Sequence, residues 1–450
     1  MFPLSCRSLS SSRGGVGRWA LSALAAVVLA YSVGLASFRV AVSAAERAPA
    51  VVENPGLEGA DGSWPRFRGP NGTGISLDQD IPVRWTESDF LWKVTLPGIG
   101  HSSPCVWGDR LFVCTASDDG LERSLVCLDA LTGETRWTST LRFEMDKRHD
   151  KNSFASCTPA TDGERVYVAF SSTEQYSLLA FDFEGAQVWR YELGPYQSQH
   201  GSGTSPMVFE DLVYLGNDQD GPSSIVAVDC ETGKERWKLE RAADVVSYST
   251  PFILQRPGVG PEVVFSSKAE GLAGLDARTG APHWKTGPFA DRTVSSAAYR
   301  DGIVFQTSGG AGTGKYMVAV RPGGASGSTN DLETLWTRNR TLPYVPSPIA
   351  FGDHVYLWGD NGVVSCLVAG SGENVWTERV GGMFSGSPVC VDGKLYCISE
   401  EGEMVVVAAS PEFKLIARNP LGEASHSTPA VARGRMYLRT FHQLICVGKK

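Results

Sequence analysis

One short pattern occurs three times in the chain and constrains its fold more than any other feature. The three segments are VCLDALTGETRW (126–137), VAVDCETGKERW (226–237) and AGLDARTGAPHW (273–284). Each has a short apolar run, an Asp, a Thr-Gly pair, and a Trp eight residues after the Asp. A self-similar unit indicates a repeat architecture, in which neighbouring units bury each other's apolar faces.

A Ser-Pro or Thr-Pro pair marks the start of most units. It occurs at residues 103–104, 158–159, 205–206, 250–251, 347–348, 387–388 and 428–429. The interval from Pro251 to Pro348 is double, and SSAAYRDGIVFQTS (295–308) fills it, with Ala297 where the proline would stand. These landmarks predict eight units, spaced by roughly 40 to 55 residues.

Each unit is expected to contain four β-strands. TPATDGERVYVAF (158–170) has two short apolar runs around an Asp-Gly turn, which predicts a β-hairpin. The apolar run of the repeated pattern supplies a third strand and the Trp segment a fourth. Between them the Asp can accept hydrogen bonds from turn amides, and the Gly can adopt positive φ. The composition agrees, since the chain has 50 Gly and only 20% charged residues.

Four antiparallel strands in each of eight units predict an all-β fold, an eight-bladed β-propeller. The last unit, STPAVARGRMYLRTFHQLICVGKK (427–450), has three strands and lacks the Trp strand. A spare strand of that type, FLWKVTL (90–96), precedes the first unit. We therefore expect this N-terminal strand to complete the last blade and close the ring.

The repeated pattern resembles the pyrroloquinoline-quinone (PQQ) repeat. That repeat forms the tryptophan-docking blades of quinoprotein dehydrogenases and of the propeller subunit of the outer-membrane β-barrel assembly machinery. The resemblance covers about residues 86–449 and is specific for the blade type, not for cofactor binding. It implies that the motif tryptophans are structural and pack on the neighbouring blade: Trp92, Trp137, Trp189, Trp237, Trp284, Trp336 and Trp376.

Two units depart from this pattern. In one, Ile416 is expected to stand where the other units have Trp. In the other, Arg321 replaces the Asp and PGGASGSTNDLE (322–333) is inserted.

The N-terminal region has the composition of a targeting segment. Arginines precede an uncharged run at 19–38, and a small-residue site follows near Ala44. Because such a run is also long enough to span a bilayer, residues 1–45 are predicted to be a signal peptide or a membrane anchor. In both cases the remainder is exported, either periplasmic or membrane-anchored with the propeller outside the cytoplasm. Residues 46–85 are then a strap or linker, and 86–450 are the propeller.

WPRFRGPNGTGIS (64–76), within this linker, also looks like a feature of exported bacterial PQQ-like propellers. We interpret it as a Gly/Pro-rich strap over one propeller face, with a flexible linker as the alternative.

The cysteines show no disulfide framework, since nine of them follow residue 45 without tight spacing. Three share a repeat position where other units have Ala or Gly and are expected to act as small apolar side chains: Cys127, Cys366 and Cys446. A bridge is conceivable but not favoured at Cys105/Cys114 and Cys390/Cys397.

Motifs for catalysis are incomplete. Quinoprotein dehydrogenases carry an adjacent Cys-Cys disulfide over PQQ, with Ca²⁺ ligands beside it, whereas this chain has no Cys-Cys pair. GGAGTGK (309–315) fits a phosphate-binding loop, but Tyr316 replaces its Ser/Thr and a strand follows. NDQDGPSS (217–224) offers oxygen ligands suited to Ca²⁺ but lacks the closing Glu. We therefore predict no catalytic residue, no metal site and no cofactor, PQQ with Ca²⁺ belonging only to an alternative.

Polar residues ahead of the blades form one candidate site. The segments just before the first strand of each blade converge on the mouth of a propeller's central channel, where sequence-distant residues can build a pocket. The candidate ligand-binding residues are His101, Arg148, His149, Asn152, His200, Tyr248, Tyr344 and His426. A hydrated channel mouth without a ligand is the alternative.

The sequence favours a non-enzymatic PQQ-like propeller of the bacterial cell envelope, a binding or assembly scaffold for protein partners. The barrel-assembly propeller is a lipoprotein, whereas no Cys directly follows the apolar run in this chain. Two alternatives stay open: a quinoprotein-type oxidoreductase using PQQ, and a small-ligand or glycan-binding sensor module. A net charge of −8 without a basic stripe argues against nucleic acid as a partner.

Overall fold

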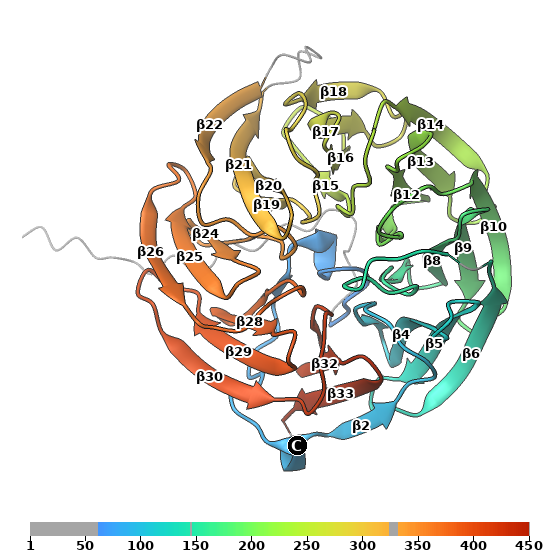
Figure 1. Ribbon diagram of the computed structural model, residues 1–450, viewed down its shortest axis with the longest axis horizontal. Helices are drawn as coiled ribbons and strands as arrows, with labels where there is room; N and C mark the ends of the chain where they lie inside the picture. The colour runs from blue at the N-terminus through green and yellow to red at the C-terminus, as the bar shows by residue number, and fades with distance from the viewer. Residues whose placement is uncertain (1–61, 145, 324–331, 450) are drawn as a thin grey trace, which may run out of the picture. The chain divides into compact units, whose positions relative to one another are not determined.

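The computed structural model describes residues 62–144, 146–323 and 332–449, which form eight antiparallel four-stranded blades arranged in a ring (Figure 1). The first strand of each blade lies toward the centre and the last strand toward the rim. The predicted all-β, eight-bladed propeller is confirmed. The predicted targeting segment, residues 1–45, lies outside the described residues. Within the described ranges no helix is long and apolar enough to cross a membrane.

The first four blades follow the chain order. Blade 1 consists of β3 (Cys105–Trp107), β4 (Arg110–Ala116), β5 (Glu122–Asp129) and β6 (Thr135–Arg142). Blade 2 consists of β7 (Ala160–Thr161), β8 (Arg165–Ser171), β9 (Tyr176–Asp182) and β10 (Gln187–Gly194). Blade 3 consists of β11 (Met207–Phe209), β12 (Leu212–Asn217), β13 (Ser223–Asp229) and β14 (Glu235–Arg241). Blade 4 consists of β15 (Phe252–Leu254), β16 (Glu262–Ser267), β17 (Gly271–Asp276) and β18 (Pro282–Lys285).

The last four blades include both strands contributed by the leader. Blade 5 consists of β19 (Ala298–Arg300), β20 (Ile303–Gly310), β21 (Thr313–Pro322) and β22 (Leu332–Arg338). Blade 6 consists of β23 (Ile349–Phe351), β24 (His354–Trp358), β25 (Val363–Val368) and β26 (Asn374–Arg379). Blade 7 consists of β27 (Val389–Val391), β28 (Lys394–Ile398), β29 (Glu403–Ala408) and β30 (Leu415–Pro420), with the short β1 (Ile75–Ser76) parallel to β27. Blade 8 consists of β31 (Ala430–Ala432), β32 (Arg435–Arg439), β33 (Gln443–Gly448) and β2 (Trp92–Thr95).

The N-terminal strand β2 closes the ring, as the sequence predicts. It pairs antiparallel with β33, with Trp92 opposite Cys446 and Thr95 opposite Gln443. The first and last parts of the chain therefore share one sheet, and no blade is left with three strands.

The repeated pattern builds a joint between neighbouring blades. The Asp129 carboxylate accepts hydrogen bonds from the amides of Leu131 and Thr132 (2.8 and 2.9 Å), which shapes the turn between β5 and β6. Gly133 in this turn has φ 78°, and a Cβ there would lie 2.8 Å from the indole of Trp92 in blade 8. Glycine is thus required at position 133 for two reasons: its positive φ and the close approach of the docked indole.

The docked indoles also donate hydrogen bonds to the next blade. The Nε1–O distances are 2.8 to 3.3 Å for Trp92–Ala130, Trp137–Phe183, Trp189–Cys230, Trp237–Ala277, Trp336–Ala369 and Trp376–Ser410. The residue opposite each motif tryptophan on the third strand of its blade is small: Cys446, Cys127, Ala180, Ala227, Gly274, Ala319 and Cys366.

The exceptions to the pattern occur where docking is interrupted. Trp284 is buried, but its Nε1 has no partner among the described residues, and it faces blade 5, where Arg321 replaces the turn Asp. In blade 7 the residue opposite Val406 is Ala417, and the turn between these strands is one residue longer than the same turn in blades 1 and 3. The expectation that Ile416 takes the Trp position was therefore wrong by one residue. Blade 8 has no third-to-fourth-strand turn, since its fourth strand comes from the N-terminus, so blade 7 has no turn on which an indole could dock.

A leader residue packs beside the blade that lacks its own tryptophan. Trp85 is buried, and its amide donates to the side-chain oxygen of Asn419 in β30 (3.0 Å). Asn419 donates in turn to the carbonyl of Val83 (3.1 Å). Trp85 and Ala417 belong to one apolar core. Trp85, which lies outside the repeats, thus packs in the core beside blade 7, whose fourth strand has Ala417 at the tryptophan position.

The Ser/Thr-Pro landmarks link the blades a second time, around the channel. The Thr158 hydroxyl accepts the amide of Ser103 (3.0 Å), and the Ser103 hydroxyl accepts the amide of Thr428 (3.0 Å), which joins the last blade to the first. The same bond, from amide to hydroxyl, links Thr158 to Ser205, Thr250 to Ser296, Ser296 to Ser347, Ser347 to Ser387 and Ser387 to Thr428. We call these residues the hydroxyl ring.

The leader crosses the inner strands at the centre of the ring, where η1 (Pro70–Gly72) lies (Figure 1). Trp64 exchanges two 2.8 Å backbone hydrogen bonds with Val106 in blade 1. The Asn71 amide exchanges hydrogen bonds of 2.7 and 2.8 Å with Ile253 in blade 4. The carbonyl of Gly74 accepts the amide of Cys390 in blade 7 (2.7 Å).

Two leader arginines are buried in this crossing without an acidic partner. Arg66 donates to the carbonyl of Pro251, and Arg68 donates to the carbonyl of Pro348. Burial lowers the pKa of each to about 9, and for Arg66 the neighbouring Arg68 contributes. Their hydrogen bonds to the landmark prolines fix the leader to blades 4 and 6.

Candidate ligand cavity in the central channel

A cavity of about 530 Å³ lies on the channel and is lined from all eight blades. Its lower tier consists of seven of the eight residues of the hydroxyl ring: Ser103, Thr158, Ser205, Thr250, Ser347, Ser387 and Thr428. Its second tier lies two residues earlier in each blade: His101, Ser156, Gly203, Tyr248, Val294, Val345, Ser385 and His426. In extended backbone, residues two apart point to the same side, which explains the two tiers. Phe67 of the leader also lines the cavity.

The structure brings seven of the eight candidate residues to this cavity: His101, His149, Asn152, His200, Tyr248, Tyr344 and His426. Arg148 is the exception. Its side chain is exposed, donates to the carbonyl of Asn152 (3.0 Å) and places its guanidinium 5.1 Å from the ring of Phe154. It therefore braces its own loop and does not line the cavity.

The loop between blades 1 and 2 is tied to three other blades at the channel mouth. The Lys151 ammonium contacts both carboxylate oxygens of Glu400 in blade 7 (2.8 and 3.2 Å). The Lys151 carbonyl lies 3.3 Å from Nδ1 of His426, which must donate because a carbonyl only accepts. The His149 amide donates to the carbonyl of His200 (3.2 Å), ahead of blade 3.

Two histidines of the second tier form an aromatic cluster. The rings of His101 and His426 lie 4.5 Å apart, and each lies 5.1 Å from the ring of Phe441. Burial lowers the pKa of His101 well below its usual value, and the charges of His426, Arg439 and Arg148 add to this. Burial also lowers the pKa of His426, although Glu400 opposes the shift. Both rings are therefore neutral at pH 7.

Sequence reasoning missed Arg292 and Asp360, which also line the cavity. The Asp360 carboxylate accepts the amides of Tyr344 (2.7 Å) and Val345 (3.1 Å), and burial raises its pKa. The Arg292 guanidinium makes no hydrogen bond or ion pair to the described residues. Arg292 precedes Ser296 by four residues, and the other units have unrelated residue types at that position, so the repeats give no signal for it.

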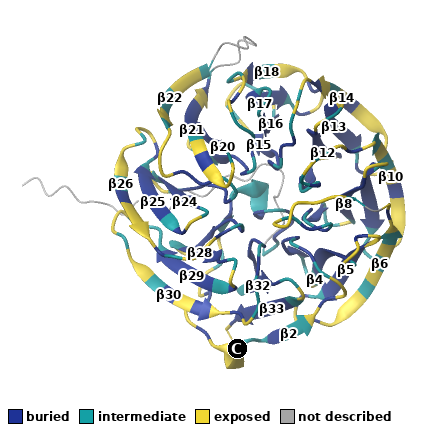
Figure 2. Cartoon of the chain, in the orientation of Figure 1, coloured by how far each residue is buried: buried dark blue, intermediate teal, exposed yellow. Residues whose placement is uncertain are grey.

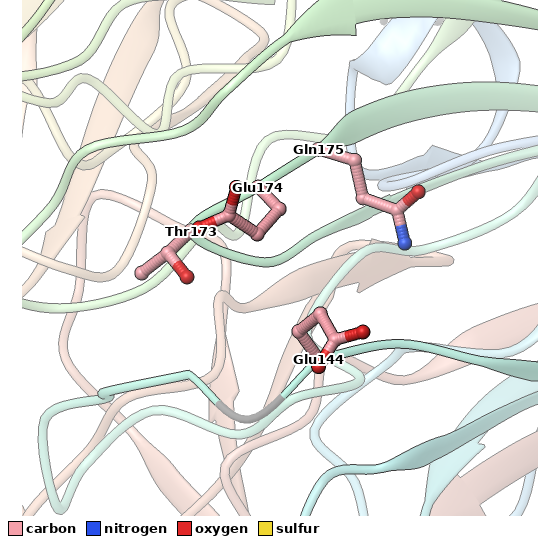
Figure 3. A pocket seen from close by; sticks show the side chains of 4 residues that line it. All are labelled: Glu144, Thr173, Glu174 and Gln175. Carbon is pink, nitrogen blue, oxygen red and sulfur yellow. The ribbon is translucent and has the colours of Figure 1, made fainter.

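A second, shallow hollow lies away from the channel. Figure 3 shows Glu144 facing Thr173, Glu174 and Gln175 across it. Three of these four side chains are exposed, and the amide of Gln175 already accepts a hydrogen bond from Arg190 (2.6 Å). None of the four described side chains that line it is buried.

The residues present do not fit the quinoprotein cofactor pattern. No cysteine is among the described residues of the cavity wall, and all nine cysteines of the described ranges are buried and unbridged, including Cys105/Cys114 and Cys390/Cys397. No three His, Cys, Asp or Glu side chains in those ranges are grouped to hold a metal ion. The GGAGTGK segment connects the paired strands β20 and β21, so it is a hairpin and does not precede a helix.

Comparison with known proteins assigns the chain to a protein family. The family profile described as outer membrane protein assembly factor BamB matches residues 87–308, 318–412 and 360–447. The chain belongs to this family. The BamB of Moranella endobia is 25% identical over 252 residues, which are 50% of this chain and 60% of that protein. The BamB of Yersinia pestis is 25% identical over 274 residues, which are 57% of this chain and 66% of that protein. The chain thus matches less than two thirds of the length of these relatives.

Solved structures show the same fold. The crystal structure of BamB from Moraxella catarrhalis has a TM-score of 0.58 at 16% identity, covering 80% of this chain and 98% of that chain. A europium-containing methanol dehydrogenase has a TM-score of 0.50 at 13% identity, covering 84% and 89%. At these identities the likeness establishes the propeller fold that the PQQ-like repeat predicts, and no more than the fold.

Proposed function

We propose that this BamB-family propeller is a non-enzymatic scaffold of the bacterial cell envelope that supports the assembly of outer-membrane proteins by binding protein partners. The observation that carries the proposal is the family match, which extends over nearly the whole ring, from residue 87 to residue 447. The family description names outer-membrane protein assembly as the process, and the propeller ring offers a surface on which partner proteins can bind.

The architecture is suited to a scaffold. The Asp, Gly and Trp of the repeated pattern are engaged in turns and interblade contacts, so these residues serve the ring and leave no reactive group exposed. The rim strands are largely exposed, as the outer edge of Figure 2 shows. Their unpaired edges offer backbone donors and acceptors to which an extended segment of a partner can add.

The remaining features are part of the same proposal. The protein works without a cofactor, since the described residues do not build the adjacent Cys pair and Ca²⁺ ligands of quinoproteins. It is exported to the periplasm, and residues 1–45 are either removed or retained as an anchor. The PQQ-dependent oxidoreductase is the competing account.

Chemical cross-linking in intact cells tests the proposal. A tagged chain is cross-linked, purified from the envelope fraction and analysed by mass spectrometry beside a tagged, unrelated periplasmic protein. We expect proteins of outer-membrane protein assembly to be enriched over this control. Enrichment of redox carriers alone, or of nothing beyond the control, would count against a scaffold.

A further inference from the structure

The channel cavity contains a positive charge that the protein itself does not neutralise. Arg292 lines the cavity and is half-buried, and its guanidinium pairs with no described carboxylate. Of the acidic groups nearby, Asp360 already accepts two backbone amides and Glu400 is held by Lys151. A partly buried guanidinium without a counter-ion is costly, and an anionic ligand would remove that cost.

The hydroxyl ring supplies further donors on the same cavity. In Ser103, Thr158, Ser205, Ser347 and Ser387 the hydroxyl oxygen accepts an amide of the neighbouring blade. None of these hydroxyls donates a hydrogen bond to a described residue, so their O–H groups are available to the cavity. A circle of O–H donors favours an oxygen-bearing anion over a cation.

Another part of the wall is apolar and favours a ligand with an organic body. Phe67, Val294, Val345 and Met383 line the cavity together with the rings of Tyr248 and Tyr344. A volume of about 530 Å³ lies within the range of small-molecule sites and far exceeds a single inorganic anion. A planar carboxylate also matches the two-pronged donor geometry of a guanidinium.

We propose that the channel cavity binds a small organic carboxylate, with its carboxylate on Arg292 and its apolar body against Phe67, Tyr248 and Tyr344. This site is separate from the rim surfaces proposed for protein partners. Lys151, which pairs with Glu400 across the channel mouth, also lines this cavity.

Isothermal titration of the full purified chain tests this with three probes: 4-phenylbutanoate, its uncharged amide 4-phenylbutanamide, and inorganic phosphate. We expect saturable binding of one molecule of the acid. The amide should bind at least about tenfold more weakly because it lacks the charge-assisted hydrogen bond. Phosphate should also bind at least about tenfold more weakly, because it has no apolar body to pack against Phe67 and the tyrosines. In Arg292→Gln the affinity for the acid should fall by about tenfold or more. Its melting temperature without ligand should not fall below the wild-type value, because the guanidinium has no partner among the described residues and its partial burial is unfavourable.

Arg142→Gln is the matched control, since Arg142 lies at the end of the rim strand β6, is exposed and does not line the cavity. It should bind the acid as the wild type does. Equal binding of acid and amide, preference for phosphate, equal loss in both variants, or no binding of the acid would each overturn the proposal.

Discussion

At the scale of single residues, the contact between a turn glycine and an indole determines how blades dock. In five blades a Cβ on the turn glycine would lie 2.6 to 2.8 Å from the tryptophan of the preceding blade: Gly133, Gly185, Gly233, Gly280 and Gly372. Each also has positive φ. The residue opposite the tryptophan is small for the complementary reason, since the indole covers it from the fourth strand.

Two glycine substitutions distinguish the cost of positive φ from the cost of the contact with the indole. Gly233 (φ 68°) lies against Trp189, whereas Gly393 (φ 67°) has nothing within 4 Å of the added Cβ. Gly393→Ala should cost about 1 kcal/mol from backbone strain alone, and Gly233→Ala about 2 kcal/mol or more because the indole must also move. Denaturant unfolding measures both. Equal losses would show that the indole contributes nothing.

The histidine cluster gives the stability a pH dependence of known sign. Burial lowers the pKa of His101 in the folded state, so as the pH falls below about 6.5 the unfolded chain takes up the proton first. The contribution of His101 is complete above that pH and is lost on acidification. Urea midpoints between pH 7 and 5 should therefore fall more steeply for the wild type than for His101→Gln. Parallel curves would contradict the assignment.

At the scale of elements, the sequence predicts the strands that belong to the repeats. It does not predict contacts made by residues outside the repeated pattern. The blades and the closing strand β2 follow from repeated landmarks and from one missing strand. Ile416 was misplaced because the turn between β29 and β30 is one residue longer than the same turn in blades 1 and 3. Trp85 was missed because its partners in β30 lie more than 300 residues away and no repeat announces them. Arg292 was missed although its unit was recognised, because it lies four residues before Ser296 and no residue type recurs at that position in the other units.

Trp85 should contribute as much to the stability of the fold as a motif tryptophan does. It is buried in the core that blade 7 shares with blades 8 and 1, so Trp85→Ala should destabilise the fold by about 3–5 kcal/mol. Leu77→Ala is the control, because Leu77 belongs to the same leader but is 76% exposed. Its effect should stay within about 0.5 kcal/mol. Thermal unfolding compares them, and a Trp85→Ala loss as small as the control would refute the role.

At the scale of the whole molecule, the ring is closed twice, by β2 on β33 and by the hydroxyl ring from Thr428 to Ser103. A closed ring leaves no blade face open, which suits a stable surface for partners. The repeats supply the exposed rim strands, whereas Arg292, the centre of the proposed ligand site, is a residue that they do not specify.

Removal of the closing strand should open the ring. A chain that begins at residue 97 lacks β2 and the leader, which exposes the edge of β33 and the apolar face of blade 8. We expect a lower melting temperature and self-association in size-exclusion chromatography. A chain that begins at residue 62 keeps β2 and should remain monodisperse under the same conditions. A stable, monodisperse chain from residue 97 would show that β2 is dispensable.

The central claim is that this propeller is a scaffold for outer-membrane protein assembly and not an oxidoreductase. Deletion of the gene in the native host, followed by electrophoresis of heated and unheated envelope samples, measures how much folded outer-membrane barrel protein the cells contain. The account predicts a lower amount, restored by the wild-type gene. An unchanged amount, together with loss of a PQQ-dependent oxidation, would contradict it.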